Sequence, residues 1–217
     1  MRIGVIIPVI NNNYLPGLLG CIERNKTTPD VILIVDNSKK ESIVITTRLE
    51  QAIIYRPATP FGVNESWNYG ISTLQDQVDL ITVLNDDLLI EDFFFEKLAR
   101  TAEKHQEAGV LCPATVSSAE GMKDAFAVGT GACSWMSKRE GWAWTIRSSV
   151  AALIPPIPDS LKTFCGDDWY WHHCHALGRP WLRMLDNFCF HYVGQSVKLS
   201  GIKHTLRSEK ELCLSYL

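Results

Sequence analysis

Apolar residues form four short and nearly unbroken runs in the first 84 positions, and each run is followed by polar residues. The runs cover residues 3–10, 31–35, 52–55 and 80–84. Runs of this length are typical of strands buried on both faces of a parallel sheet. Apolar positions recur at helical spacing within 14–24 and 61–74, which predicts helices between the strands. The pattern therefore indicates an α/β fold in which a central, mostly parallel sheet is flanked by helices.

The second half of the chain is less regular. A helix is expected from Glu91 to about Glu107 and a short strand from 109 to 112, after which the pattern weakens. The proline-rich segment 154–159 predicts a surface loop. A helix is then expected from Gly166 to near Gly178, followed by a last core strand over 181–185. The tail from residue 198 is mixed and amphipathic.

Acids and amides stand where the predicted strands end. Asp36 closes the second strand, and Asn85, Asp86 and Asp87 follow the fourth. Open α/β sheets bind ligands at the carboxyl ends of their strands. Adjacent carboxylates repel each other and are costly to bury without a cation, and Mg²⁺ and Mn²⁺ prefer oxygen ligands. The alternative is a solvated turn in which one acid caps the next helix.

Composition excludes several classes of protein. The net charge is −3 with no concentrated basic patch, so a nucleic-acid partner is not expected. Seven cysteines occur without a CxxC pair, which predicts reduced thiols. No apolar run is long enough for a membrane span, and the N-terminal run is too short for a signal peptide. We therefore expect a cytoplasmic location, or the host cytoplasm for a viral protein.

Glycine-rich nucleotide motifs are missing. No G-x-G-x-x-G follows the first strand and no P-loop occurs, so neither a dehydrogenase nor a P-loop enzyme is expected. A nucleoside diphosphate would need another partner for its charge, and a metal on Asp87 would supply one. Histidines 172 and 175 could share one helix face, but a second pair of zinc ligands is absent, so structural zinc is not favoured there.

Several segments occur together in an order that resembles the GT-A glycosyltransferases of the family 2 type, including rhamnosyltransferase-like bacterial and viral members. They are 3–11, 35–38, 64–70, 84–87, 166–168 and 191–194. The resemblance covers residues 1–197 as a single domain, with a nucleotide-sugar-binding half (1–112), an acceptor-binding and catalytic half (113–197), and a C-terminal tail (198–217).

The resemblance implies a metal-dependent transfer from a UDP- or dTDP-sugar to a hydroxyl of a glycan or glycoprotein acceptor, with inversion. The metal, Mn²⁺ or Mg²⁺, would lie on Asp87 and His191, since 85–87 matches the N-x-D form of the D-x-D motif. Asp168 would be the general base, and the spacing also tolerates Asp167. The residues implied to contact the nucleotide sugar are Pro8, Asn11, Asp36, Asn68, Asn85 and Asp86.

Tryptophans are candidates for the acceptor side. Trp135, Trp142 and Trp169 could stack on sugar rings, and the alternative for each is packing in the core. Ser66 and Trp67 stand where the family has Ala-Arg, and Tyr170 replaces a further family Asp. Two other interpretations of the chain are a sugar nucleotidylyltransferase and a non-catalytic nucleotide-sugar or carbohydrate-binding module. The sequence predicts no oligomeric state.

Overall fold

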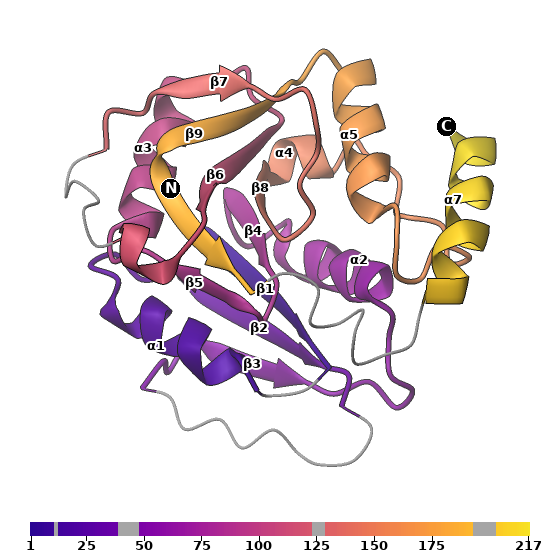
Figure 1. Cartoon of the computed structure of the whole chain (residues 1–217), viewed down its shortest axis with the longest axis horizontal. Helices are drawn as coiled ribbons and strands as arrows, with labels where there is room; N and C mark the ends of the chain where they lie inside the picture. Colours follow the sequence, from indigo (N-terminus) through magenta and orange to yellow (C-terminus); the bar gives the residue numbers. More distant parts are fainter. Residues whose placement is uncertain (11–12, 39–47, 123–128, 193–202) are drawn as a thin grey trace.

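The structure is a computed structural model that describes residues 1–10, 13–38, 48–122, 129–192 and 203–217. Its centre is a nine-stranded sheet with the order β3-β2-β1-β4-β8-β6-β9-β5, and β7 pairs with β9 (Figure 1). The strands are β1 (Ile3–Val9), β2 (Val31–Asp36), β3 (Ala52–Tyr55), β4 (Leu80–Leu84), β5 (Leu88–Ile90), β6 (Val110–Val116), β7 (Cys133–Trp135), β8 (Ala143–Arg147) and β9 (Trp181–His191).

Helices cover both faces of this sheet. They are α1 (Leu15–Arg24), α2 (Val63–Leu74), α3 (Phe94–Lys104), α4 (Ser148–Ala151), α5 (Gly166–Ala176) and α7 (Lys203–Tyr216), with a 3₁₀ turn, η1 (Ala119–Met122). One core cluster joins α1 and α3 to the sheet, and the other joins α2, α5 and α7 to the opposite face. In Figure 1, α5 and α7 stand together on one flank of the molecule. The predicted α/β class is confirmed.

Two kinds of pairing meet at β4. Strands β3, β2, β1 and β4 are parallel, as their unbroken apolar runs predict. β8 then pairs antiparallel with both β4 and β6, and β6 pairs parallel with β9. The parallel half carries polar residues at the carboxyl ends of its strands, and the mixed half brings residues from late in the chain to the same edge.

The structure corrects several expected elements in the second half. β5, β7 and β8 were not predicted, and α3 begins at Phe94 instead of Glu91. β6 continues through Pro113 to Val116, with a register shift at the proline, the kind of position at which strands tolerate proline. β9 does not end at Leu185 but runs to His191. Segment 154–159 contains no helix or strand, as expected.

The extension of β9 depends on a buried ion pair between Glu91, which precedes α3, and Lys97, which lies within α3. The side chains of Glu91 and Lys97 are each 1% exposed, and Lys97 Nζ lies 2.6 Å from Glu91 Oε2. Glu91 Oε1 accepts a hydrogen bond from the backbone N–H of Phe188. The Asn187 amide donates to the Phe94 carbonyl. These long-range contacts hold β9 in the sheet where its own sequence looks like a turn.

Candidate active site

The candidate site lies at the carboxyl end of β4. All five residues of β4 are buried, and the Asn85 N–H that follows them donates to the Trp142 carbonyl at 2.9 Å. The chain then turns into β5, where Leu88 pairs with His191 of β9. The Tyr192 N–H donates to the Asp87 carbonyl at 3.0 Å. This antiparallel pairing brings Asp87 beside a histidine that lies far away in the sequence.

Asp87 and His191 form the centre of the site. Asp87 is 3% exposed, and its Oδ1 lies 3.2 Å from His191 Nε2. Asp87 Oδ1 is nevertheless a buried oxygen without a hydrogen-bond partner. Trp142 stacks on the His191 ring with centroids 5.3 Å apart, and its indole N–H donates to Thr115 Oγ1. A fixed imidazole beside an unsatisfied carboxylate oxygen fits a divalent cation and leaves coordination positions for diphosphate oxygens.

Asp86 faces a cavity next to this pair. The cavity holds about 140 Å³ and is lined by Pro8, Ile10, Asn37, Phe61, Gly62, Val63, Asn85, Asp86 and Thr163. Burial, together with the charge of Asp87, raises the pKa of Asp86 to about 7. Three of the predicted nucleotide-sugar residues, Pro8, Asn85 and Asp86, therefore share one cavity beside Asp87.

Asp36 is already paired in the structure. Its side chain is fully buried, Oδ1 accepts from the Ser38 N–H at 2.9 Å, and Oδ2 accepts from Arg56 Nε at 2.7 Å and also contacts Nη2. Burial raises the pKa of Asp36, but the hydrogen bonds from Ser38 and Arg56 outweigh it and leave the pKa below its ordinary value. Asp36 is thus an ionised carboxylate, and its Arg56 partner was not predicted.

Two asparagines, Asn68 and Asn37, have surroundings that the sequence did not predict. The Asn68 side chain donates to the Ile157 carbonyl at 2.8 Å and accepts from the Ile157 N–H at 2.9 Å, so it fastens the 154–159 loop to α2. Asn37 lines the cavity instead, and its side chain bonds Ser66 Oγ and the Phe61 N–H. The signal for Asn37 was available, because it is an amide directly after the second strand. Asn11 lies outside the described residues.

Asp167 and Asp168 occupy the first turn of α5. Asn64 donates to the carbonyls of Leu161 and Phe164, each at 2.8 Å, and so holds the approach to this turn. The side chain of Asp167 packs against Gly141, which precedes Trp142 in the chain. Two consecutive residues therefore link the two groups of acids: Gly141 lies next to Asp167, and Trp142 stacks on His191 beside Asp87.

Arg139 is the charged residue at this second pair that sequence reasoning missed. Its Nη2 contacts Asp168 Oδ1, and its Nε lies 3.9 Å from Asp167 Oδ2. Burial, and then the charge of Asp168, raise the pKa of Asp167, while Arg139 opposes both effects. No motif surrounds Arg139 in the sequence, so nothing there marked it as a partner of the acids.

The three candidate acceptor tryptophans have different surroundings. Trp142 covers His191, whereas Trp135 is 75% exposed and pairs with Leu182 near the far end of β9. Trp169 is 7% exposed, and its indole N–H donates to the Pro155 carbonyl. The structure does not bring Trp135 or Trp169 to the Asp87 pair: Trp135 lies too far along β9, and Trp169 packs in the core.

Comparison with known proteins agrees with this geometry. S. aureus TarS shares the fold with a TM-score of 0.68 and 15% sequence identity, and the match covers 89% of this chain and 37% of TarS. GalNAc-T7, solved with UDP, GalNAc and Mn²⁺, has a TM-score of 0.67 and 12% identity, with 88% of this chain and 43% of that protein covered. S. aureus TarS 1–349 in complex with UDP-GlcNAc has a TM-score of 0.66 and 13% identity, with 92% of this chain and 61% of that one covered. The chain spans less than two thirds of each of these proteins. No curated protein sequence matches it.

The fold is that of the GT-A glycosyltransferases. Residues 4–153 match the family described as "Glycosyl transferase family 2", which is more than half of the chain. The chain therefore belongs to glycosyl transferase family 2, as the resemblance in its motifs predicted. The match ends before α5, so Asp167, Asp168 and His191 lie beyond it. Within the described residues, no helix is both long and apolar enough to cross a membrane.

Proposed function

We propose that this chain transfers a sugar from a UDP- or dTDP-sugar to a hydroxyl group of a glycan or glycoprotein acceptor. The observation that carries the proposal is the buried, unsatisfied Asp87 oxygen beside His191, next to a cavity lined by Asp86. The UDP, UDP-GlcNAc and Mn²⁺ in the structures of the similar proteins support a nucleotide-sugar donor and a divalent metal. Residues 1–112 would supply most of the donor site, and 113–197 would bind the acceptor and add Thr163 and His191 to the donor side.

Asp87 and His191 would hold Mn²⁺ or Mg²⁺, which when bound supplies positive charge that stabilises the departing diphosphate. Asp86 and Asn85 would contact the donor from the cavity wall. Asp36 would bond the ribose or the base as a carboxylate positioned by Arg56. Trp142 would keep the His191 ring in one orientation, because it stacks on one ring face while its N–H is fixed by Thr115.

Asp168 would take the proton of the acceptor hydroxyl as that oxygen attacks the anomeric carbon. A sugar hydroxyl has a pKa far above 7, so proton removal in the transition state accelerates its attack. Attack from the side opposite the diphosphate gives inversion. Arg139 contacts Asp168, and Asp167 is the neighbouring carboxylate that could serve instead. A non-catalytic binding module would not need a general base.

The test separates donor binding from chemistry. Binding of UDP and of dTDP is measured by calorimetry with and without Mn²⁺, and slow hydrolysis of the UDP-sugar is followed as release of UDP. We expect Asp87→Asn to abolish the Mn²⁺-dependent part of UDP binding. We expect Asp168→Asn to bind UDP normally and to lower turnover at least 100-fold, within the range for general-base catalysis.

Asp159→Asn is the matched control, because Asp159 is an exposed carboxylate in the 154–159 loop. It should keep wild-type binding and turnover. Unchanged Mn²⁺-dependent binding in Asp87→Asn would remove Asp87 as a metal ligand. Binding of donor without any release of UDP, even with a panel of sugar acceptors, would favour the binding module.

A further inference from the structure

Two thiols lie close to the carboxylate of the candidate base, Asp168. The Sγ atoms of Cys165 and Cys213 and a carboxylate oxygen of Asp168 all lie within 4.8 Å of one another. Cys165 precedes α5, Asp168 lies in its first turn, and Cys213 comes from α7. Within the described part of the chain, no other set of three or more Cys, His, Asp or Glu side chains converges as closely.

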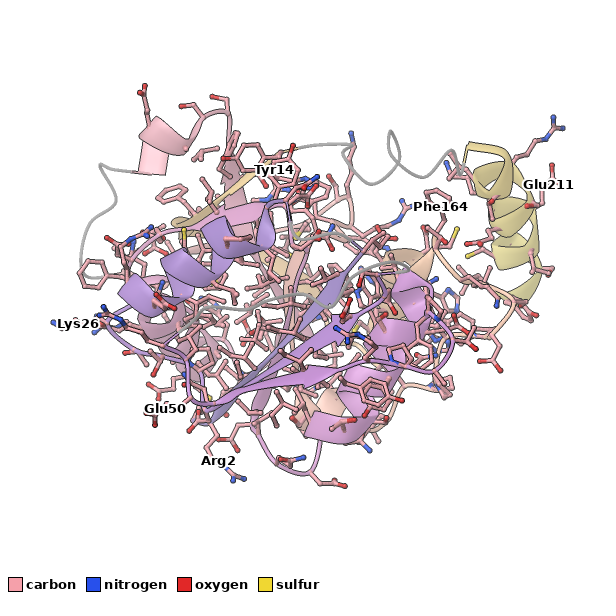
Figure 2. The ribbon with its side chains drawn as sticks, turned by 90° about the horizontal axis from the view of Figure 1, so that it is seen from below. Arg2, Tyr14, Lys26, Glu50, Phe164 and Glu211 are labelled. Atoms are coloured by element: carbon pink, nitrogen blue, oxygen red, sulfur yellow. The ribbon has the colours of Figure 1, made fainter. Side chains whose placement is uncertain are left out.

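The three side chains are fixed by the elements that carry them. Cys165 and Cys213 are 6% and 4% exposed. Cys165 has φ 65°, the one non-glycine residue with positive φ among those described, and this conformation directs the chain into α5. Glu209 Oε2, one turn before Cys213, accepts hydrogen bonds from the Thr163 and Phe164 N–H groups. Figure 2 shows Phe164 beside α7, so both thiols belong to one packed junction.

The donor set has the chemistry of a zinc site. Zn²⁺ is borderline-soft and binds thiolate and carboxylate ligands in a tetrahedron, with Zn–S near ~2.3 Å and Zn–O near ~2.1 Å. Ligand atoms within 4.8 Å of one another need only small side-chain movements to reach that geometry. Three protein ligands leave one position for water. Asp87 and His191, by contrast, offer oxygen and nitrogen without sulfur, which suits Mn²⁺ or Mg²⁺.

The surroundings allow an ion to enter. The Asp168 side chain is 23% exposed, which gives a path from solvent to the buried thiols. Burial raises the pKa of Cys165 to about 12, so the thiols are neutral without a metal, and binding must release their protons. Arg139 holds Asp168 Oδ1 in the metal-free protein, and a carboxylate has a second oxygen to offer.

We propose that Cys165, Asp168 and Cys213 form a Zn²⁺ site, distinct from the Asp87 site, that ties α7 to the start of α5. One consequence rests on the proposed function: zinc on Asp168 would occupy the general base, so the zinc-bound protein would be inactive in transfer. The site would then link the C-terminal helix to catalysis through a single ion.

The test uses the full chain, stripped of metal and kept reduced. Cd²⁺ alone is added as the probe, because cadmium bound to thiolates absorbs in the ultraviolet, and Zn²⁺ is then titrated as its competitor. We expect one equivalent of Cd²⁺ to produce the absorption, and Zn²⁺ to abolish it. Cys213→Ser and Cys165→Ser should each weaken binding at least tenfold, and Asp168→Asn should weaken it less.

Cys133→Ser is the matched control, since Cys133 is half-buried and lies on β7 outside the cluster; it should bind Cd²⁺ as wild type does. If a serine variant fails to fold, alkylation of the wild-type protein followed by mass spectrometry replaces it. Zn²⁺ should then protect Cys165 and Cys213 from alkylation but leave Cys133 reactive.

Three results would overturn the proposal: no thiolate absorption with Cd²⁺, equal absorption in Cys213→Ser, or alkylation of Cys165 and Cys213 at the same rate with and without Zn²⁺. None of these readouts needs turnover. A chain that gives the Cd²⁺ signal but fails to bind UDP with Mn²⁺ would refute the proposed function and leave the zinc site standing.

Discussion

Glu209 offers a sharp test of how α7 supports the site. Its Oε2 accepts hydrogen bonds from the Thr163 N–H at 3.0 Å and the Phe164 N–H at 2.7 Å, and the residue is 5% exposed. Glu209→Ala leaves both amide groups without their acceptor. Hydrogen bonds to a charged group contribute about 1.5–3 kcal/mol each. Both bonds are only partly buried, so we expect the free energy of unfolding to fall by about 2–4 kcal/mol.

The assay is urea unfolding followed by circular dichroism, with thermal unfolding as a check. In a chain of this size each kcal/mol lowers Tm by about 2–4 °C. Glu209→Gln keeps an amide oxygen that can accept both bonds, so it should cost only about 1 kcal/mol. Because Thr163 lines the cavity that we propose for the donor, UDP affinity should fall in the same order, with the alanine variant weakest.

Glu211→Ala is the control for a charge change on the same helix. Figure 2 shows Glu211 on the side of α7 away from Phe164, and its carboxylate pairs with Arg207 in solvent. Its loss should cost less than about 0.5 kcal/mol. The reasoning is wrong if Glu209→Ala costs under about 1 kcal/mol, or if Glu209→Gln is as damaging as Glu209→Ala.

Three further predictions concern the metal-free protein. Burial and a neighbouring charge raise the pKa of Asp86 to about 7, so the folded state holds this proton more tightly than the unfolded state, and the resulting stability is complete below pH 3.8 and lost by pH 7. In urea unfolding, the free energy of unfolding of the wild type relative to Asp86→Asn should fall by up to about 4 kcal/mol between these two pH values. Lys97→Met should cost about 3–5 kcal/mol by stranding Glu91, and adding Glu91→Gln should recover most of it in the same assay. Gly62→Ala puts a Cβ 2.1 Å from the Lys162 carbonyl oxygen and should cost about 1–3 kcal/mol by thermal unfolding.

The parallel half of the fold was predictable because its information is local. Four apolar runs and two helical periods specify β1 to β4 with α1 and α2, and a strand that ends in acids marks the ligand edge. That rule marked Asn85, Asp86 and Asp87 as a group, and the resemblance assigned the metal to Asp87. His191 needed the resemblance, since a histidine among aromatic residues indicates a core position as readily as a ligand.

The mixed half was not predictable because its strands are defined by partners. β8 is recognisable only when β4 and β6 lie on either side of it. β9 passes through Asp186 and Asn187, a pair typical of turns, and it continues because Glu91 bonds the Phe188 N–H. Arg139, Arg56 and Glu209 were missed for the same reason: each acts on a carboxylate or backbone group that only the folded chain brings near.

Asp87 and His191 lie far apart in the chain, so Asp87 is synthesised well before its partner. When Asp87 leaves the ribosome, β3, β2, β1 and β4 have been made and β8 has not, so any sheet that these four strands form has a β4 edge without its neighbour. An open edge of that kind is prone to pair with other chains. β8 is made before β9, so the β4 edge can be covered before His191 has been made. Asp87 and His191 can therefore come together only in a chain that has been made to the end of β9.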